Sequence, residues 1–255
     1  MASYLATIAI GRFDIRVHRV VHGPPIIDAV DPNLGTIANA ALGREREILD
    51  FLEGVFGRYP FETAGGIVDD VPLLFALETQ TRPIYAPIFF VFGEGESVIV
   101  HELAHQWYGD SVGLARWQDI WLNEGFATYA EWLWGEHVGG SSPEELFDSL
   151  YAAIPAQDPF WALRIGDPGP SHLFDGQVYD RGAMTVEALR ITIGDDPFFR
   201  LLRTWARNNF GKTGTTPEFI ALAERISHKE LDALFDAWLF SPTKPPAPVH
   251  GNRHQ

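Results

Sequence analysis

The sequence predicts an α+β fold in which a small sheet accompanies a larger set of helices. Residues 4–30 and 66–92 hold short runs with partial period-two alternation and β-branched side chains, and Gly23-Pro24-Pro25 marks a turn between two of them. From about residue 95 the apolar residues recur at helical spacing instead. With 255 residues, 46% of them hydrophobic, the chain can bury a large core. We expect one large domain or two lobes that share an interface.

The composition limits the classes of partner and compartment. Lys and Arg total 19 against 34 Asp and Glu, a net charge of −15, which argues against a nucleic acid or an anionic membrane as partner. The absence of cysteine excludes disulfides and thiolate metal ligands and fits the cytoplasm best. No apolar run approaches the roughly 20 residues of a membrane span, and the N-terminus lacks the apolar stretch of a signal. We therefore expect a soluble, unprocessed chain.

The N-terminal elements follow from local patterns. We expect two or three strands within residues 4–30, which must pair with another segment because isolated strands are unstable. An apolar stripe from Ile37 to Phe56 predicts one amphipathic helix, capped by Thr36 and ended by Pro60. Short apolar runs predict the strands of a small sheet at 66–68, 73–78 and 85–92.

Beyond residue 95 the pattern is mostly helical. We expect helices at about 96–109 and 119–134, followed by a helix with Ser142 as cap and Pro143 in its first turn. Residues 156–177 are rich in Pro, Gly and Asp and predict a long loop. Further helices are predicted at 178–194, 197–208, 217–226 and 231–240. From Ser241 the apolar periodicity ends, which predicts a disordered tail.

Two histidines one helical turn apart are the strongest functional signal. His101 and His105 lie in the run HELAHQWYGD, and on a helix both imidazoles can reach one ion. Glu102 lies beside that face, where it can take a proton from a water on the ion. Glu124, on the next predicted helix, is the best candidate for a third ligand. Two imidazoles and a carboxylate suit one Zn²⁺ per chain, with its fourth position open.

The alternative to metal binding is a purely structural role for each of these residues. The H-E-x-x-H pattern also occurs by chance, and helical histidine pairs are often surface or core residues. The apolar frame and the following glutamate favour the metal site. Metal-bound imidazoles usually donate their other N–H to an acceptor, and we expect Thr128 or Glu131, on the helical face of Glu124, to orient one of them. The remaining candidates are expected to bind no metal: His18, His22, His172, His250 and His254.

Five of the eight tryptophans fall between Trp107 and Trp134. So many large rings are expected to be mostly buried, which makes the two metal-bearing helices the hydrophobic centre of the fold. A platform for a sugar or an aromatic ligand is the alternative use of these rings.

The segments HELAHQWYGD and WLNEGFATYAEW together resemble the zinc aminopeptidases of the aminopeptidase N and leukotriene hydrolase family. In that family the third ligand is the glutamate of an N-E-G-F-A segment, eighteen residues beyond the second histidine, and residues 106–123 are those eighteen. The resemblance covers nearly all of residues 1–240. It implies a thermolysin-like catalytic domain with a small-sheet lobe, a helical lobe and the metal between them.

The resemblance also implies substrate contacts in the segment LFALETQTRP. On pattern alone, Glu78 is an exposed residue at a strand end. The family has a G-A-M-E-N strand whose backbone pairs with the substrate and whose glutamate binds the free α-amine. Ala76, Leu77 and Glu78 match the centre of that strand, whereas Phe75 replaces its glycine and Thr79 its asparagine.

Tyr179 is the second residue whose role the resemblance changes. On pattern alone, it is an aromatic residue at a helix start and predicts core packing. The family has a tyrosine just before a K-G-A-M or R-G-A-M helix that points at the zinc and stabilises the oxyanion. The run from Tyr179 to Met184 matches this, and a phenol can donate a hydrogen bond to an alkoxide without carrying charge at neutral pH.

Together these features imply a zinc aminopeptidase that acts on peptides with a free N-terminus. Glu102 would move a proton from the attacking water to the leaving amine, and Glu78 would limit cleavage to the first peptide bond. The alternative is a zinc-binding but inactive fragment with a peptide-binding or assembly role.

The family also has a β-rich domain before this unit, and the chain resembles only its last strands. We expect remnant strands at 1–35, the catalytic domain at 36–240 and the tail at 241–255. In the family the preceding domain supplies a further Gln or Glu to the substrate amine, so amine recognition is expected to be weaker here. Apolar surface would stay exposed unless a second subunit of a homo-oligomer covers it.

Overall fold

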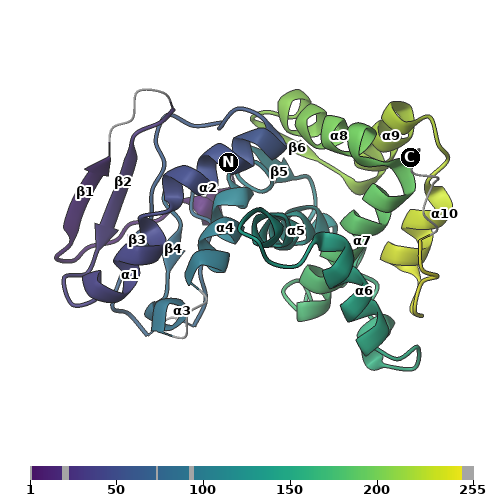
Figure 1. The fold of residues 1–255 in the computed structure, drawn as a ribbon, viewed down its shortest axis with the longest axis horizontal. Helices are drawn as coiled ribbons and strands as arrows, with labels where there is room; N and C mark the ends of the chain where they lie inside the picture. The colour runs from purple at the N-terminus through teal and green to yellow at the C-terminus, as the bar shows by residue number, and fades with distance from the viewer. Residues whose placement is uncertain (1, 19–22, 73, 92–94, 249–255) are drawn as a thin grey trace. The chain divides into compact units, whose positions relative to one another are not determined.

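The computed structural model describes residues 2–18, 23–72, 74–91 and 95–248. The chain forms two compact units, residues 1–113 and 114–255, each with its own set of elements (Figure 1). Helices dominate and the strands are short, which confirms the predicted α+β class. Within the described ranges, no helix combines the length and the apolar character needed to cross a membrane.

A four-stranded sheet organises the first unit. Across the sheet its strands are β1 (Asp14–His18), β2 (Ile26–Val30), β3 (Ile67–Val68) and β4 (Ile84–Tyr85). β1 and β2 are antiparallel, whereas β2, β3 and β4 run parallel. Side chains of β2 alternate between buried and half-buried, and β1 is an exposed edge. Of the two strands found within residues 4–30, β1 pairs with β2, and β2 pairs with the later strand β3, so the N-terminal strands do join a further segment, as expected.

The helix predicted at 37–56 is instead two helices, α1 (Gly35–Leu42) and α2 (Glu45–Phe56). Gly43 lies at the break, and glycine costs about 1 kcal/mol relative to alanine inside a helix. After the break, α2 buries Glu45 together with its apolar stripe. Gly57, with a φ of 95°, ends α2 in a conformation that favours glycine, before Pro60 is reached.

Two predicted strands of the first unit are wrong. In place of a strand at 73–78, Leu77 forms a single bridge with Ile84; residue 73 lies outside the described residues. The run 85–92 leaves the sheet after Tyr85, and α3 (Pro87–Val91) follows; residue 92 also lies outside the described residues. Proline suits a first helical turn because its φ is already helical and its missing N–H is not needed there.

α4 (Gly95–His105) carries the histidine pair and ends earlier than the predicted Gly109. It packs on α1, α2 and α3. Trp107, just past its end, packs on Phe56 and Tyr59, with ring centroids 5.8 and 5.3 Å apart. Its indole N–H donates to the Gly57 carbonyl at 2.9 Å. The end of α4 is therefore fixed to the segment that follows α2.

The second unit is mainly helical, and its helices agree with the predicted ones to within a few residues. They are α5 (Trp121–His137), α6 (Pro143–Ala153), α7 (Gly176–Ile193), α8 (Asp195–Asn208), α9 (Thr216–Ser227) and α10 (Asp232–Phe235), the last continued by a π-helical turn, Asp236–Phe240. β5 (Val112–Leu114) pairs with β6 (Lys212–Gly214). Ser142 caps α6 in a capping box with Glu145, as predicted. The predicted long loop contains one short 3₁₀ turn, Pro159–Ala162.

Arg181 ties the start of α7 to the end of the chain. Its side chain is fully buried, which lowers the pKa of its guanidinium to about 10. It donates hydrogen bonds of 2.8–3.1 Å to the carbonyl oxygens of Trp161, Leu163, Ala237, Trp238 and Ser241.

Part of the predicted disordered tail is packed against α6. The Tyr151 hydroxyl donates to the Pro245 carbonyl at 2.8 Å, and Lys244 Nζ donates to the Ile154 carbonyl at 2.8 Å. Lys244 also lies over the Tyr151 ring, 3.9 Å from its centroid. Residues 249–255, with His250 and His254, lie outside the described residues.

Candidate metal centre and substrate site

α4 presents two histidines on one face. The ring centroids of His101 and His105 are 4.7 Å apart, as expected for residues separated by one helical turn. The helix buries Ile99, Val100 and Leu103 completely, so close packing holds the backbone that carries both rings.

A backbone carbonyl orients His105. Its Nδ1 lies 3.0 Å from the oxygen of Tyr108. A neutral imidazole that donates from Nδ1 keeps the lone pair of Nε2 for a metal ion. We expected this orienting role for Thr128 or Glu131. Thr128 Oγ1 is buried without a hydrogen-bond partner in the part of the chain that is described, and the role of Glu131 stays a prediction.

Glu124 lies in the first turn of α5, with only 4% of its surface exposed. The next residue, Gly125, meets Gly182 of α7 so closely that a Cβ on either would lie 2.7–2.9 Å from the Cα of the other. The Trp121 indole N–H donates to Thr216 Oγ1 at 2.8 Å. The first turn of α5 is thus held by backbone contact with α7 and by a buried hydrogen bond.

His101, His105 and Glu124 form a group that could hold a metal ion. One candidate ligand atom from each residue lies within 4.8 Å of the other two. Two nitrogens and one carboxylate oxygen are a donor set that suits Zn²⁺, and the Nδ1 contact of His105 leaves Nε2 for the ion. The three residues therefore fit a single divalent ion and would fill three of the four positions that Zn²⁺ usually takes.

Two more carboxyl groups are buried in this part of the first unit. Glu102, between the two histidines on α4, is 5% exposed. Asp110 is 4% exposed, and its oxygens have no hydrogen-bond partner in the described ranges. Burial, reinforced by the charge of Glu78, raises the pKa of Asp110 well above its usual value. This favours the protonated form of Asp110.

Glu78 lies at a turn rather than at an exposed strand end. Leu77 exchanges two backbone hydrogen bonds of 2.9 Å with Ile84, and Glu78 follows with 7% of its surface exposed. The Tyr4 hydroxyl donates to Glu78 Oε1 at 2.9 Å. Ala76 is half-buried, whereas the side chain at the family's glycine position, Phe75, is 53% exposed.

Tyr179 lies in the first turn of α7 and is half-buried. It precedes Gly182 by three residues, and Gly182 contacts the neighbour of Glu124. The Gly125–Gly182 contact thus couples the placement of the α7 start to that of Glu124.

His18 and His172 are not among the residues of the candidate metal group. His18 is on the exposed edge strand, 4.0 Å from Asp28. His172 is exposed, and its Nδ1 lies 2.7 Å from Asp175. His22 lies outside the described residues.

The sequence gives little indication that three groups contribute to the site. Tyr4 is far from Glu78 along the chain, and the Tyr108 carbonyl belongs to the backbone, which every residue shares. Gln106 is a polar residue next to the candidate metal ligand His105, and it is completely buried. Its place between His105 and Trp107 is the one available hint.

Comparison with known proteins identifies the family. Residues 93–238, which include the metal group and Tyr179, match the peptidase family M1 domain. Glutamyl aminopeptidase of Rattus norvegicus is 25% identical over 100% of this chain and 29% of its own length. Probable aminopeptidase 2 of Sulfurisphaera tokodaii is 27% identical over 94% of this chain and 33% of its own. The chain thus spans about a third of the length of these relatives.

Solved structures share the fold. The M1 zinc metallopeptidase of Deinococcus radiodurans superposes with a TM-score of 0.81 at 28% identity, over 96% of this chain and 55% of that one. Leukotriene A4 hydrolase of Saccharomyces cerevisiae gives a TM-score of 0.72 at 21% identity, over 93% of this chain and 40% of that one, which supports the fold alone. The predicted catalytic-domain fold and the resemblance are confirmed. Because the matched domain covers more than half of the sequence, the chain belongs to peptidase family M1.

Proposed function

We propose that this chain is a zinc-dependent aminopeptidase that hydrolyses the first peptide bond of peptides with a free N-terminus. The observation that carries the proposal is the group formed by His101, His105 and Glu124, whose ligand atoms lie close enough for one ion. Membership of peptidase family M1 and relatives that are named aminopeptidases support the same activity.

Each residue has a distinct role in this proposal. Bound zinc would supply Lewis-acid chemistry and lower the pKa of a coordinated water to about 7. Glu102 takes the proton of the attacking water and passes it to the leaving amine, a task for a buried carboxylate next to the ligands. Tyr179 donates its phenolic hydrogen bond to the oxyanion of the tetrahedral intermediate.

Glu78 binds the α-amine of the substrate and so sets the cleavage position. A buried carboxylate that already accepts one hydrogen bond is well suited to a cationic amine. Ala76 lies beside it and offers backbone groups to the peptide, whereas the backbone N–H and C=O of Leu77 already pair with Ile84. A variant of the Deinococcus radiodurans enzyme, 29% identical to this chain, has been solved with the substrate Tyr-Ser-Ala, which supports a peptide substrate.

The experiment compares aminoacyl-anilide turnover by the zinc-loaded chain and by its Glu102→Gln variant. We expect zinc-dependent turnover in the wild type and a loss of about 10²–10⁴-fold in kcat in the variant, because a general base is removed. Zinc stoichiometry, measured by elemental analysis, should stay at one per chain in both. Free peptides should also be cleaved faster than N-acetylated ones, and equal rates would contradict the role of Glu78.

One observation favours a second candidate, a zinc-binding but inactive chain that binds peptides or acts in assembly. The exposed Phe75 occupies the position of the family's glycine, where a bulky side chain replaces a bare backbone. Stoichiometric zinc without turnover of any anilide would support this candidate over the enzyme.

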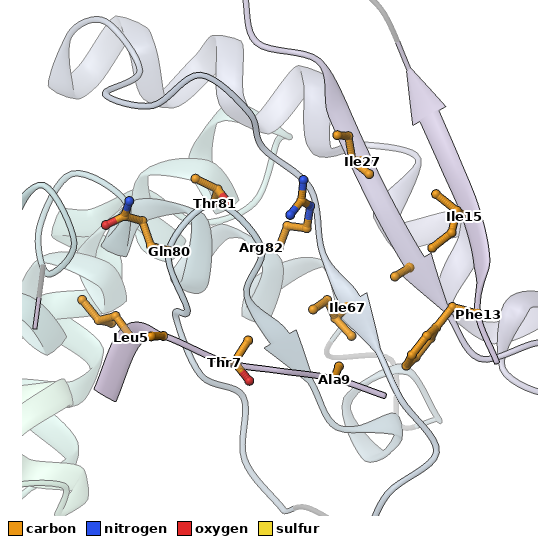
Figure 2. A pocket seen from close by; sticks show the side chains of 12 residues that line it. Leu5, Thr7, Ala9, Phe13, Ile15, Ile27, Ile67, Gln80, Thr81 and Arg82 are labelled. Atoms are coloured by element: carbon orange, nitrogen blue, oxygen red, sulfur yellow. The ribbon is translucent and has the colours of Figure 1, made fainter. Parts of the chain in front are cut away.

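We further propose that a second copy of the chain covers an apolar face of the first unit. A pocket of about 490 Å³ lies along the N-terminal segment. Figure 2 shows Leu5, Phe13, Ile15, Ile27 and Ile67 among the side chains that line it, with Gln80, Thr81 and Arg82 on its polar side. Ile8 and Ile10, on the same segment, are 86% and 92% exposed. Apolar patches of this kind often mark interaction sites. We expect light scattering to show an oligomer that Ile10→Lys dissociates, and a wild-type monomer would contradict the proposal.

We propose the cytoplasm as the location, because a chain without cysteine fits a reducing compartment. Fractionation of the source cells tests this, and recovery with an extracellular fraction would contradict it.

A further inference from the structure

Glu78 is held by a residue at the start of the chain. Tyr4 lies in the 3₁₀ turn Ser3–Leu5 and donates its hydroxyl hydrogen to Glu78 Oε1 at 2.9 Å, across 74 positions of sequence. Oε2 of Glu78 accepts no hydrogen bond from the described residues. A carboxylate fixed by one oxygen in this way presents the other oxygen in a defined direction.

Gln106 holds the backbone of the same turn. Its side chain is completely buried, and it directly follows the metal-binding His105. Its Nε2 donates to the Glu78 carbonyl at 3.3 Å, and its Oε1 accepts the Thr81 N–H at 2.8 Å. One amide thus joins both ends of residues 78–81 to the last turn of α4.

The turn needs this support because its backbone is strained. Thr81 has a φ of 70°, and a β-branched residue in the left-handed region is an outlier. Such conformations persist where surrounding contacts over-determine them, and they cluster at functional sites. Here the contacts come from Gln106 and from Thr79, whose hydroxyl donates to the Arg82 carbonyl at 2.6 Å.

We infer that Tyr4 and Gln106 are positioning residues for amine recognition. Tyr4 sets the direction of the Glu78 carboxylate, and Gln106 sets its distance from the histidines of α4. All of these residues belong to the first unit. The inference rests on the proposed function, because it assigns the selectivity for a free α-amine to two residues that support Glu78.

The kinetic test uses Tyr4→Phe and Gln106→Met, which keep side-chain size and remove the hydrogen bonds. For aminoacyl-anilides we expect KM to rise about tenfold in each variant while kcat changes less than threefold, the pattern of lost substrate binding. The preference for free over N-acetylated peptides should fall by a similar factor. Tyr151→Phe, which removes a phenol–carbonyl hydrogen bond of 2.8 Å elsewhere, is the matched control and should leave both values unchanged.

Gln106→Glu covers the case in which Gln106→Met does not fold. At this buried position beside Glu78, Glu102 and Asp110 the introduced carboxyl group is expected to be protonated, so it keeps an acceptor for the Thr81 N–H and replaces the amide N–H by a single O–H donor; we expect a smaller rise in KM. Wild-type KM and wild-type free-amine preference in folded Tyr4→Phe and in either folded Gln106 variant would overturn the inference.

Calorimetry gives a readout that does not depend on turnover. L-leucine and 4-methylpentanoate differ only in the α-amine, and both are titrated into the zinc-loaded chain. We expect the Kd of L-leucine to weaken about tenfold in Tyr4→Phe and Gln106→Met, with no change for 4-methylpentanoate. Unchanged L-leucine binding in both variants overturns the inference alone. Equal affinities of the wild type for the two ligands would instead overturn the role of Glu78 itself, and with it the inference.

Discussion

The buried guanidinium of Arg181 connects separate segments of the second unit. Among the described residues Arg181 has no carboxylate partner, and it donates instead to five carbonyl groups in two segments far from it in sequence. Burying a charge in this way is tolerated because every N–H direction meets an acceptor. Arg181 therefore has a structural role, which the R-G-A-M motif of the family does not by itself indicate.

We predict that Arg181→Met lowers the free energy of unfolding by at least about 3 kcal/mol, because it leaves several buried carbonyls without donors. Urea unfolding followed by circular dichroism measures this. Arg200→Met is the control, since Arg200 is exposed and donates a hydrogen bond to the Ile226 carbonyl; it should change stability by less than about 1 kcal/mol. A similar small effect for Arg181→Met would contradict the prediction.

Glu187 is a buried acid of the second unit that is expected to titrate near neutral pH. It is 2% exposed, the Tyr129 hydroxyl donates to it at 2.5 Å, and Arg190 lies 4.0 Å away. Burial, partly offset by these two partners, raises the pKa of Glu187 to about 7. At pH values between the pKa of Glu187 in the unfolded chain, 4.5, and its pKa in the folded chain, about 7, the folded chain binds more protons than the unfolded chain. The contribution of Glu187 to stability therefore falls as the pH rises from about 4.5 to 7.

We predict a fall of about 3 kcal/mol in the free energy of unfolding from this residue across that interval, and no further change above it. The measurement compares wild type and Glu187→Gln by urea unfolding at pH 5 and pH 8. The variant should lose less stability between the two values, because glutamine does not titrate. Identical losses in the two proteins would show that Glu187 does not titrate in this range.

At the scale of elements, the crossing of α5 and α7 matters most to the candidate site. The Gly125–Gly182 contact brings the two backbones together beside Glu124 and three residues after Tyr179. A Cβ at either position would lie closer than 3 Å to backbone atoms, which cannot move aside as a flexible side chain can. The two helices can therefore approach only because both residues lack side chains.

We predict that Gly125→Ala or Gly182→Ala costs about 1–3 kcal/mol in stability and weakens zinc binding, since the helices must separate next to a proposed ligand. Unfolding and competitive zinc titration measure the two effects. Gly135→Ala lies on the same helix with open space around its Cβ; it should stabilise the chain by up to about 1 kcal/mol and leave zinc affinity unchanged. Equal behaviour of Gly125→Ala and Gly135→Ala would contradict the prediction.

Local pattern predicted the elements of the second unit better than those of the first. Ser142 and Thr215 cap their helices in capping boxes, and such signals act within a few residues. In the first unit, the helix predicted at 37–56 breaks at Gly43 and Arg44, and α2 buries Glu45. Burial and the charge of Asp28 raise the pKa of Glu45 well above its usual value. The predicted strand that starts at Tyr85 leaves the sheet there, after a two-residue pairing with β3, and α3 follows at Pro87–Val91.

At the scale of the whole molecule, the proposed zinc ion joins residues that the chain keeps apart in sequence. His101 and His105 end α4, whereas Glu124 begins α5. An ion that binds the folded chain alone stabilises it by mass action, by about 4 kcal/mol at a thousandfold excess over Kd.

We therefore predict that removing zinc with a chelator lowers the Tm and that adding zinc restores it. Differential scanning calorimetry of the wild type and of Glu124→Gln checks this. The variant should show a much smaller shift, because the third ligand is lost. A Tm that does not respond to chelation in the wild type would argue against a bound ion.

By itself, the sequence determined the α+β class, most helices and the chemistry of the proposed site. It could do so because these features depend on helical periodicity, local caps and the spacing of a few ligand types along the chain. The tertiary structure alone decided that the Tyr108 carbonyl orients His105, that Tyr4 and Gln106 hold Glu78, and that two glycines set the approach of α5 to α7. These contacts join backbone atoms, or side chains many positions apart, and so depend on how the chain packs.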